Sequence, residues 1–359
     1  MTTSTSFDNT SQPVVVDAHE DIAMNAILGR DFLKSALEKR ALEGTTRRGA
    51  ATIGLPDLLK ANVRVIFATI WVAPYRNDDP RQRRLLPCYK TPQEAHEQAR
   101  EQLAYYVKLA ANPRIILVRT RSDLDRTLNP SENRLGLVLL MEGADPLITP
   151  QEAKNWFDEG VRIIAPAWRR TRYAGGTGAP GPLTADGREL MLEMERAGLI
   201  LDVSHLADES FSEALDMFHG PALASHSNCR AYVPTDRQLS DEMISALTKR
   251  DGVIGTALYN GFLRSDWRDE QGTKSQVTLF DVVKHIQHVC AIAGDSLHAA
   301  IGSDFDGGFG MESIPAELDT VADLQKIGGA LKAAQLSDTD VENILGGNWL
   351  RLLRAALPP

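Results

Sequence analysis

The sequence has little of what several protein classes depend on. Only three cysteines occur among the 359 residues, at Cys88, Cys229 and Cys290, an odd number with no paired spacing. A disulfide framework is therefore not expected, and a reducing compartment fits this composition better. Basic residues are outnumbered by acidic ones, and the formal net charge is −9. That balance argues against a nucleic-acid groove or an anionic membrane surface as the main partner.

Signals for export and for membrane insertion are missing as well. The N-terminal segment MTTSTSFDNTSQP has no basic start followed by an apolar stretch, so we expect no signal peptide. No apolar window is long enough for a transmembrane helix, and the terminal LLRAALPP is too short for the tail of a lipid-anchor signal. We therefore predict a cytoplasmic protein with no membrane partner. We expect residues 1–12 to form a flexible arm and residues 13–359 a single domain.

What the chain does contain is a series of eight short apolar runs, rich in Val, Ile, Leu and Ala. Runs this continuous are typical of strands buried on both faces, as in a parallel sheet. Helix-like segments lie between them, and several begin with Ser, Thr or Asp where an N-cap belongs. The runs cover residues 14–16, 63–70, 135–141, 161–165, 199–203, 222–224, 253–258 and 299–301, and the helical segments cover 91–111, 186–197, 208–218, 241–249, 278–293 and 321–334.

This alternation predicts the fold. Strands that alternate with helices indicate βα units and a parallel sheet, and eight of them favour a closed TIM (β/α)8 barrel. An open doubly wound sheet is the alternative, and it is disfavoured because no G-x-G-x-x-G or Walker sequence follows the first run. We expect residues 71–90, which are polar and rich in Pro and Arg, to form a loop over the barrel mouth. Residues 337–359 should form a C-terminal helical extension packed on the outside.

Acidic and imidazole side chains follow five of the eight runs. Barrel enzymes place their chemistry at the carboxyl ends of the strands, so groups at these positions should meet at one rim. Histidine and carboxylate are ligands that zinc prefers, and one carboxylate can bridge two metal ions. The residues are His19 and Asp21 after the first run, Glu142 after the third, His205 after the fifth, His226 after the sixth, and Asp304 and Asp306 after the eighth.

Each of these residues also has an ordinary interpretation when taken alone. Glu142 could be a buried carboxylate with a partner, and His205 a hydrogen-bonded core or loop histidine. Two neighbouring motifs are excluded: HEDIA lacks the second His of a zincin helix, and DFDGG lacks the third oxygen ligand and the closing Glu of an EF-hand. The other histidines lie in helical or pre-strand segments, where we expect surface or packing roles; they are His96, His219, His285, His288 and His298.

The order of the motifs resembles a known family. D-x-H-x-D, M-E-G, L-D-V-S-H, S-H-S-N, R-x-L-x-D and G-x-D-F-D-G follow one another as in the membrane dipeptidase (renal dipeptidase) family of zinc metallopeptidases, over residues 14–350. The resemblance implies two Zn2+ ions per chain, with Glu142 bridging them. It implies that His19 and Asp21 hold one ion and that His205 and His226 hold the other.

The resemblance also implies an activity. The family cleaves the peptide bond of dipeptides with a metal-bridging hydroxide, which makes Glu142 and Asp304 the expected catalytic residues. Asp304 matches the aspartate that handles the proton, and Arg237 matches the arginine that grips the substrate carboxylate. The family tends to form dimers, so a homodimer is expected by resemblance.

Three positions depart from the family pattern. Trp168 stands where the family has a His that helps hold the scissile oxygen, Glu20 stands in place of an Asn, and Phe262 in place of a substrate-side Tyr. The predicted substrate-binding residues Arg237, Trp168 and Phe262 thus form an altered set, whereas the metal set is intact. Two alternatives stay open: a metal-dependent amidohydrolase acting on another amide, lactam or ester, and a metal-binding barrel that has lost catalysis.

Overall fold

Eight parallel strands close into a barrel in the computed structural model of this chain. Six are neighbours in one sheet and two form a second sheet, and parallel bridges between Ala224 and Ile254 and between Glu20 and Phe305 join the two sheets on both sides. The structure describes residues 12–43, 49–77, 86–269 and 273–359. In barrel order the strands are β1 (Val15–Glu20), β2 (Val63–Trp71), β6 (Leu135–Glu142), β7 (Val161–Ala165), β8 (Ile200–Asp202), β9 (Ala222–Leu223), β10 (Ile254–Thr256) and β11 (Ala299–Ile301).

These are the eight runs that the sequence marks as strands, so the predicted TIM barrel is confirmed. The strands are buried on both faces because their apolar side chains alternate between two clusters. Val65 and Phe67 of β2 pack inside the barrel, whereas Ile66, Ala68 and Ile70 pack outside it against the helices. A strand with two apolar faces needs cover on both sides, which only the interior and the helical layer together supply.

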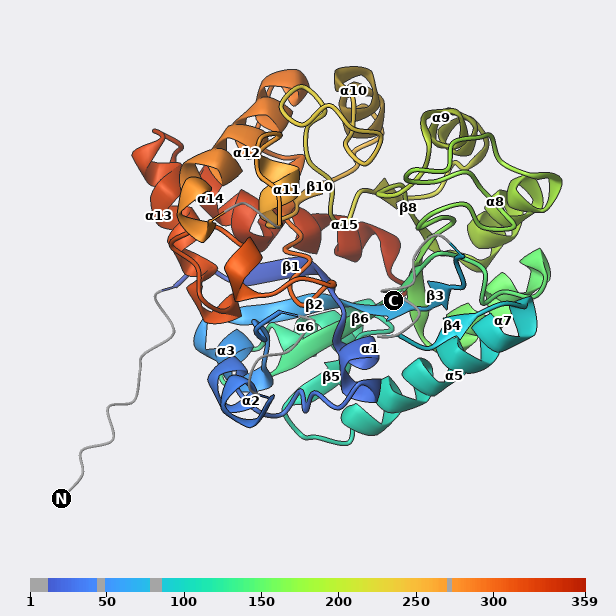
Figure 1. The fold of residues 1–359 in the computed structure, drawn as a ribbon, viewed down its shortest axis with the longest axis horizontal. Helices are drawn as coiled ribbons and strands as arrows, with labels where there is room; N and C mark the ends of the chain where they lie inside the picture. Colours follow the sequence, from blue (N-terminus) through green and yellow to red (C-terminus); the bar gives the residue numbers. More distant parts are fainter. Residues whose placement is uncertain (1–11, 44–48, 78–85, 270–272) are drawn as a thin grey trace.

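The helices follow one another around the strands (Figure 1). Thr91 starts the longest described helix with a capping box, and a proline occupies its first turn. The expected helical segments are present with ends shifted by one or two residues, except that the last begins with a separate 3-10 turn, Val321–Asp323. The α-helices are α1 (Ile22–Ile27), α2 (Ala36–Glu43), α3 (Leu55–Lys60), α5 (Pro92–Leu109), α6 (Arg121–Thr127), α7 (Ala153–Glu159), α8 (Ala185–Ala197), α9 (Asp208–Met217), α10 (Asp241–Thr248), α11 (Asn260–Leu263), α12 (Leu279–Ala293), α13 (Gln325–Ala333), α14 (Asp338–Glu342) and α15 (Asn348–Ala356).

The C-terminal helix does not pack on the outside, so that expectation is wrong for α15. Trp349, Leu352 and Leu353 belong to the same buried cluster as the inward side chains of the strands. The Trp349 ring lies 5.1 Å from Phe67 of β2, and its indole N–H donates to the Ile301 carbonyl at 2.9 Å. The final helix therefore supplies part of the barrel core.

The segment expected as a loop, residues 71–90, is partly ordered into strands. Trp71 still belongs to β2, and β3 (Ala73–Pro74) pairs in parallel with β4 (Cys88–Tyr89). Residues 78–85 of this loop, and residues 1–11 of the predicted N-terminal arm, lie outside the described residues. One further short strand that the sequence did not indicate, β5 (Ile115–Leu117), pairs in parallel with the first three residues of β6. Across the described part of the chain, no helix combines the length and apolar character needed to cross a bilayer.

Candidate active site

Three histidines from three strand ends converge on the carboxylate of Glu142 at the end of β6. His205 Nε2 lies 2.9 Å and His226 Nε2 lies 3.4 Å from Glu142 Oε1, and His19 Nε2 lies 3.6 Å from Oε2. The His19 and His226 rings stack with centroids 3.6 Å apart. All four side chains are buried. The barrel therefore brings these four predicted metal ligands into one cluster.

The fifth predicted ligand, Asp21, lies in a second group that shares His19. His19, Asp21 and Asp304 each offer a donor atom within 4.8 Å of the others, as do His19, Glu142 and His226. The Asp304 carboxylate lies 3.9 Å from His19 Nε2, and Thr69 of β2 donates to the carboxylate of Asp21. Two overlapping donor groups around one imidazole are the arrangement that a pair of nearby cations would require.

The hydrogen bonds behind the histidines fit metal binding. Ser225 Oγ donates to Asp202 Oδ2 at 2.6 Å, so its oxygen accepts from His226 Nδ1 at 2.8 Å and from His19 Nδ1 at 3.3 Å. Thr177 Oγ1 lies within hydrogen-bond distance of His205 Nδ1, at 3.0 Å. With Nδ1 held by a hydroxyl, the Nε2 lone pair of each ring is directed at Glu142, and an outer partner of this kind orients metal-binding histidines.

Sequence reasoning missed this outer network. Asp202 and Ser225 are fully buried, and Asp202 also accepts from Ser204 Oγ at 2.6 Å and from the Ser225 amide at 3.1 Å. A signal was present, because Asp202 lies in LILDVSH and Ser225 in ALASHSN, each within three residues of a predicted histidine ligand. Only the neighbouring positions of β8 and β9 show that one aspartate serves both motifs.

The charges in the cluster have opposed effects on its pKa values. Burial alone would raise the pKa of Glu142, but the charge of His19 and the contacts of the three histidines lower it well below its usual value. Burial, followed by the charge of Arg237, lowers the pKa of His205 to about 4. Burial also lowers the pKa of His226 far below normal. An ionised carboxylate beside two neutral imidazoles is the ligand state that a divalent metal requires.

His19 is the one histidine of the cluster whose Nε2 atom is left without a hydrogen-bond partner among the described residues. That atom is buried. Burial lowers the pKa of His19, but the charge and hydrogen bond of Glu142, together with the charges of Asp21 and Asp304, outweigh this effect and raise the pKa to about 9. A buried donor atom with no partner, between Glu142 and Asp304, is costly unless another group satisfies it. The donor set and this orphaned nitrogen both fit a metal site.

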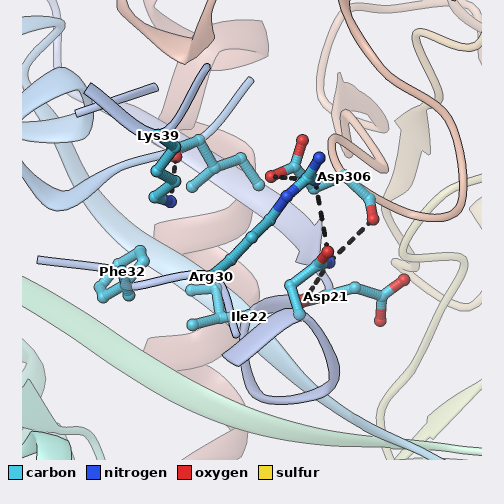
Figure 2. Close-up of a pocket in the computed structure, with 8 residues that line it drawn as sticks. Asp21, Ile22, Arg30, Phe32, Lys39 and Asp306 are labelled. Carbon is cyan, nitrogen blue, oxygen red and sulfur yellow. Dashed lines mark hydrogen bonds and ion pairs between the residues drawn. The ribbon is translucent and has the colours of Figure 1, made fainter. Parts of the chain in front are cut away.

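The loop that carries Asp304 is held in place by buried contacts of Asp306. Asn25 Nδ2 donates to the backbone oxygens of Asp21 at 2.7 Å and of Asp306 at 2.9 Å. Arg30 Nη1 lies 3.2 Å from Asp306 Oδ2, and the other oxygen of Asp306 accepts from Thr52 Oγ1 at 2.7 Å. Figure 2 shows the Arg30 side chain reaching Asp306 across a pocket that Asp21, Arg30 and Asp306 help to line. Asp306 follows the eighth strand, but its carboxylate contacts Arg30 and Thr52 and anchors the loop.

The backbone conformation of this loop explains why it needs such contacts. Asp304 and Asp306 both adopt left-handed conformations, with φ of 60° and 59°, which are uncommon for residues with a side chain. Gly307 leaves room beside them, because a Cβ there would lie 2.0 Å from Asp304 Oδ1. The buried contacts of Asp306 compensate for this strain and hold the Asp304 carboxylate toward the cluster.

Arg237 lies beside the histidines, with part of its guanidinium already engaged. Nη1 donates to the Ser204 carbonyl at 2.8 Å and Nη2 donates to the His226 carbonyl at 2.6 Å. Its buried Nε has no hydrogen-bond partner in the described part of the chain. The Phe262 ring of α11 lies 5.1 Å from the guanidinium carbon. The edge formed by Nε and Nη2 therefore retains donors for a ligand.

Trp168 lies on the other side of Glu142, in the loop after β7. Its ring is 5.1 Å from Trp71 in an edge-to-face contact and 6.2 Å from the His205 ring. Trp168, Glu142 and Gly143 line the same hollow. The structure thus places all nine predicted site residues at one end of the barrel, with Phe262 reaching the site through Arg237.

The remaining histidines and Glu20 lie apart from the cluster of donor atoms. His285 is buried beneath the Cys229 amide, which donates to its Nδ1 at 3.0 Å, and His288 pairs with Asp241 at 2.8 Å. Both have packing or surface roles, as expected. Glu20 is fully buried, and burial followed by the charge of Asp17 raises its pKa well above the usual value.

Comparisons with known proteins show the family. The family model described as membrane dipeptidase (peptidase family M19) matches residues 9–357. An uncharacterized protein in the pqqA 5' region of Klebsiella pneumoniae is 32% identical over 266 residues, which cover 71% of this chain and 94% of that protein. Dipeptidase aclJ of Aspergillus oryzae is 31% identical over 238 residues, 65% of this chain, and the chain spans 54% of its length.

Solved structures share the fold. A dipeptidase described as a metallo peptidase of family M19 superposes with a TM-score of 0.80 at 23% identity, covering 97% of this chain and 100% of that one. A metallo peptidase from Rhodobacter sphaeroides, liganded with a phosphinate mimic of L-Ala-D-Ala, gives 0.79 at 23% identity, covering 96% and 99%. Because the family model covers nearly the whole sequence, this chain belongs to the membrane dipeptidase family.

Proposed function

We propose that this chain hydrolyses the peptide bond of dipeptides with two zinc ions bound at the rim of the barrel. The observation that carries the proposal is the convergence of three Nε2 atoms on one buried carboxylate, each backed by a hydroxyl at Nδ1. The residues that would hold the metal are His19, Asp21, Glu142, His205 and His226, with Glu142 between the two ions. When bound, such ions lower the pKa of a shared water and polarise the scissile carbonyl.

The other residues act on the substrate and the proton. Asp304 is buried next to His19, and burial raises its pKa well above the usual value, so its carboxyl group can hold the proton taken from water and pass it to the leaving nitrogen. Arg237 donates from its free edge to the C-terminal carboxylate of the substrate. This contact restricts the enzyme to short peptides, because a longer chain has no carboxylate at that position.

The comparisons support the substrate class. The Rhodobacter sphaeroides metallo peptidase, which shares the fold, is liganded with a mimic of a dipeptide. Several of the curated relatives are named dipeptidases. We further propose that residues 13–359 act as one catalytic domain, in the cytoplasm and as a homodimer.

The experiment that tests this function combines metal analysis with a dipeptide panel. Purified protein should contain two zinc ions per chain and hydrolyse simple dipeptides, and chelation should remove both the metal and the activity. Activity on amides, lactams or esters without dipeptide hydrolysis would favour an amidohydrolase. Stoichiometric metal without turnover of any of these substrates would indicate a binding protein.

Trp168 should limit the rate on ordinary dipeptides. An indole donates one hydrogen bond, but it cannot become a cation near neutral pH as imidazole can, and its larger ring fills part of the hollow beside Glu142. Replacing it by histidine, Trp168→His, should therefore raise kcat/KM on Ala-Ala by about 100-fold, the low end of what general acid–base help contributes. The measurement is kcat/KM of both proteins across the panel.

The matched control is Trp168→Phe, which keeps an aromatic ring against Trp71 but offers no hydrogen-bond donor. It should not gain activity. If the wild type and Trp168→His have the same rates and the same order of preference, Trp168 only packs in its loop and does not contact the reacting groups.

A further inference from the structure

A hollow beside Glu142 has an unusual charge. It comprises about 230 Å³ of space that includes open solvent, and it lies between Val72 and Pro74 just after β2, the end of β6 and the loop that follows β7. Its lining includes Glu142, Tyr89, Trp168 and two consecutive arginines, Arg169 and Arg170. Two consecutive arginines therefore line a hollow at the candidate active site of a chain whose net charge is −9.

Neither arginine has an acidic partner among the described residues. Arg169 Nη2 donates to the Gly178 carbonyl at 3.2 Å, and Arg170 Nη2 donates to the Pro180 carbonyl. A carbonyl oxygen occupies one of the five N–H donors of a guanidinium and leaves its charge unbalanced. Both groups thus retain donors and a full positive charge.

The next arginine in the same loop shows the contrast. Arg172 Nε lies 3.7 Å from Asp145 Oδ1, and the backbone amide of Arg172 donates to the same oxygen at 2.9 Å. Tyr89 donates its hydroxyl to the other oxygen of Asp145 at 2.5 Å, so both oxygens of that carboxylate are engaged. Among the described residues that line the hollow, Glu142 is the one acid, and His205 and His226 contact it. No other acid among the described residues that line the hollow faces Arg169 and Arg170, so both can bind the carboxylate of a ligand.

The position of Arg237 decides which part of a dipeptide this hollow faces. Arg237 contacts the carbonyls of Ser204 and His226, after β8 and β9, whereas the hollow lies beside the segment after β2, the end of β6 and the loop after β7. If Arg237 holds the C-terminal carboxylate, the N-terminal residue lies across Glu142, with its side chain directed to the hollow.

We infer that the preferred substrates are dipeptides with Asp or Glu as the N-terminal residue, whose side-chain carboxylate Arg169 and Arg170 bind. The inference rests on the proposed dipeptidase function and adds its substrate class. Charge-assisted hydrogen bonds from two guanidinium groups favour an acidic side chain over its neutral isostere, and the partial exposure of both arginines limits the effect to about 10-fold.

The test measures kcat/KM for Glu-Ala, Gln-Ala, Ala-Glu and Ala-Gln with the zinc-loaded protein. The wild type should prefer Glu-Ala over Gln-Ala by about 10-fold and should show a smaller ratio between Ala-Glu and Ala-Gln. In the double variant Arg169→Gln/Arg170→Gln, the ratio of Glu-Ala to Gln-Ala should fall toward one. Charge reversal, Arg169→Glu/Arg170→Glu, should bring it below one. The control Arg188→Gln removes an exposed arginine of α8 that pairs with Glu213, and it should keep the wild-type ratio.

Equal rates on Glu-Ala and Gln-Ala would overturn the substrate class and leave the dipeptidase proposal standing. An acidic preference that survives in the double variant would show that Arg169 and Arg170 do not read the side chain. A larger ratio for Ala-Glu over Ala-Gln would reject the N-terminal assignment. No hydrolysis of any of the four dipeptides by metal-loaded protein would overturn the proposed function and this inference together.

Discussion

Replacing Glu142 by glutamine is expected to give a folded protein that holds one metal ion or none and loses more than about 100-fold in kcat/KM. The carboxylate offers two oxygens to three imidazoles, with distances of 2.9 Å, 3.4 Å and 3.6 Å. An amide has one oxygen and no charge, and its N–H groups would point at Nε2 lone pairs. It cannot bridge two cations, so both proposed ions lose a ligand, and the loss should exceed the 10–100-fold cost of deleting an outer partner.

The measurement is elemental analysis of protein grown with zinc, together with kcat/KM on a dipeptide. The control Glu189→Gln makes the same chemical change on the exposed face of α8 and should keep both metal and activity. His226→Ala and His205→Ala should each empty one site, and His19→Ala and Asp21→Ala the other. Wild-type protein without stoichiometric metal after growth with zinc would contradict the whole metal assignment.

Replacing Arg237 by alanine is expected to cost about 2–5 kcal/mol in transition-state binding, because the substrate carboxylate is left unpaired in a buried site. This corresponds to a loss of about 30-fold to several thousand-fold in kcat/KM. The arginine is 4% exposed, and its Nε has no partner in the described chain, so a carboxylate at that edge would satisfy it. Amidating the C-terminus of the dipeptide removes the same charge pair from the substrate side.

The amidated substrate separates substrate binding from support of the site. Arg237 also donates to the carbonyls of Ser204 and His226, so alanine could disturb the neighbouring histidines. Arg237→Lys keeps the charge with fewer donors and provides a second variant if the alanine protein folds poorly. Amidation should harm the wild type far more than either variant. Equal sensitivity of all three proteins to amidation would show that Arg237 does not bind the carboxylate.

The cluster of histidines around Glu142 was predictable because its positions follow from local pattern and one topological rule. An apolar run followed by Asp, Glu or His indicates a buried strand with a polar end, and parallel strands of a barrel bring their carboxyl ends to one rim. This logic led from the sequence to His19, Glu142, His205 and His226 without any distance being known. The motif order added Asp304 and Arg237 through resemblance, and their roles stay predictions.

Other features could not be read from the sequence, because they depend on partners far apart in the chain. An apolar helix face does not tell which surface receives it, so α15 was expected outside, although Trp349 packs in the barrel core. By its position after a strand, Asp306 resembles a site residue, but in the fold its carboxylate contacts Arg30 and Thr52. Asp202 gains its importance only because β9 brings Ser225 beside it.

The apolar runs and the polar residues that follow them were enough to predict the barrel, its eight strands and the residues gathered at one rim, because burial on two faces and position at a strand end are local properties. The tertiary structure alone decided how the charges are balanced. Arg172 has a carboxylate partner, whereas Arg169 and Arg170 have none among the described residues, and nothing in the run R-R-T-R distinguishes them. Pairing depends on distances of a few ångströms between loops that follow different strands, and only the folded chain sets those distances.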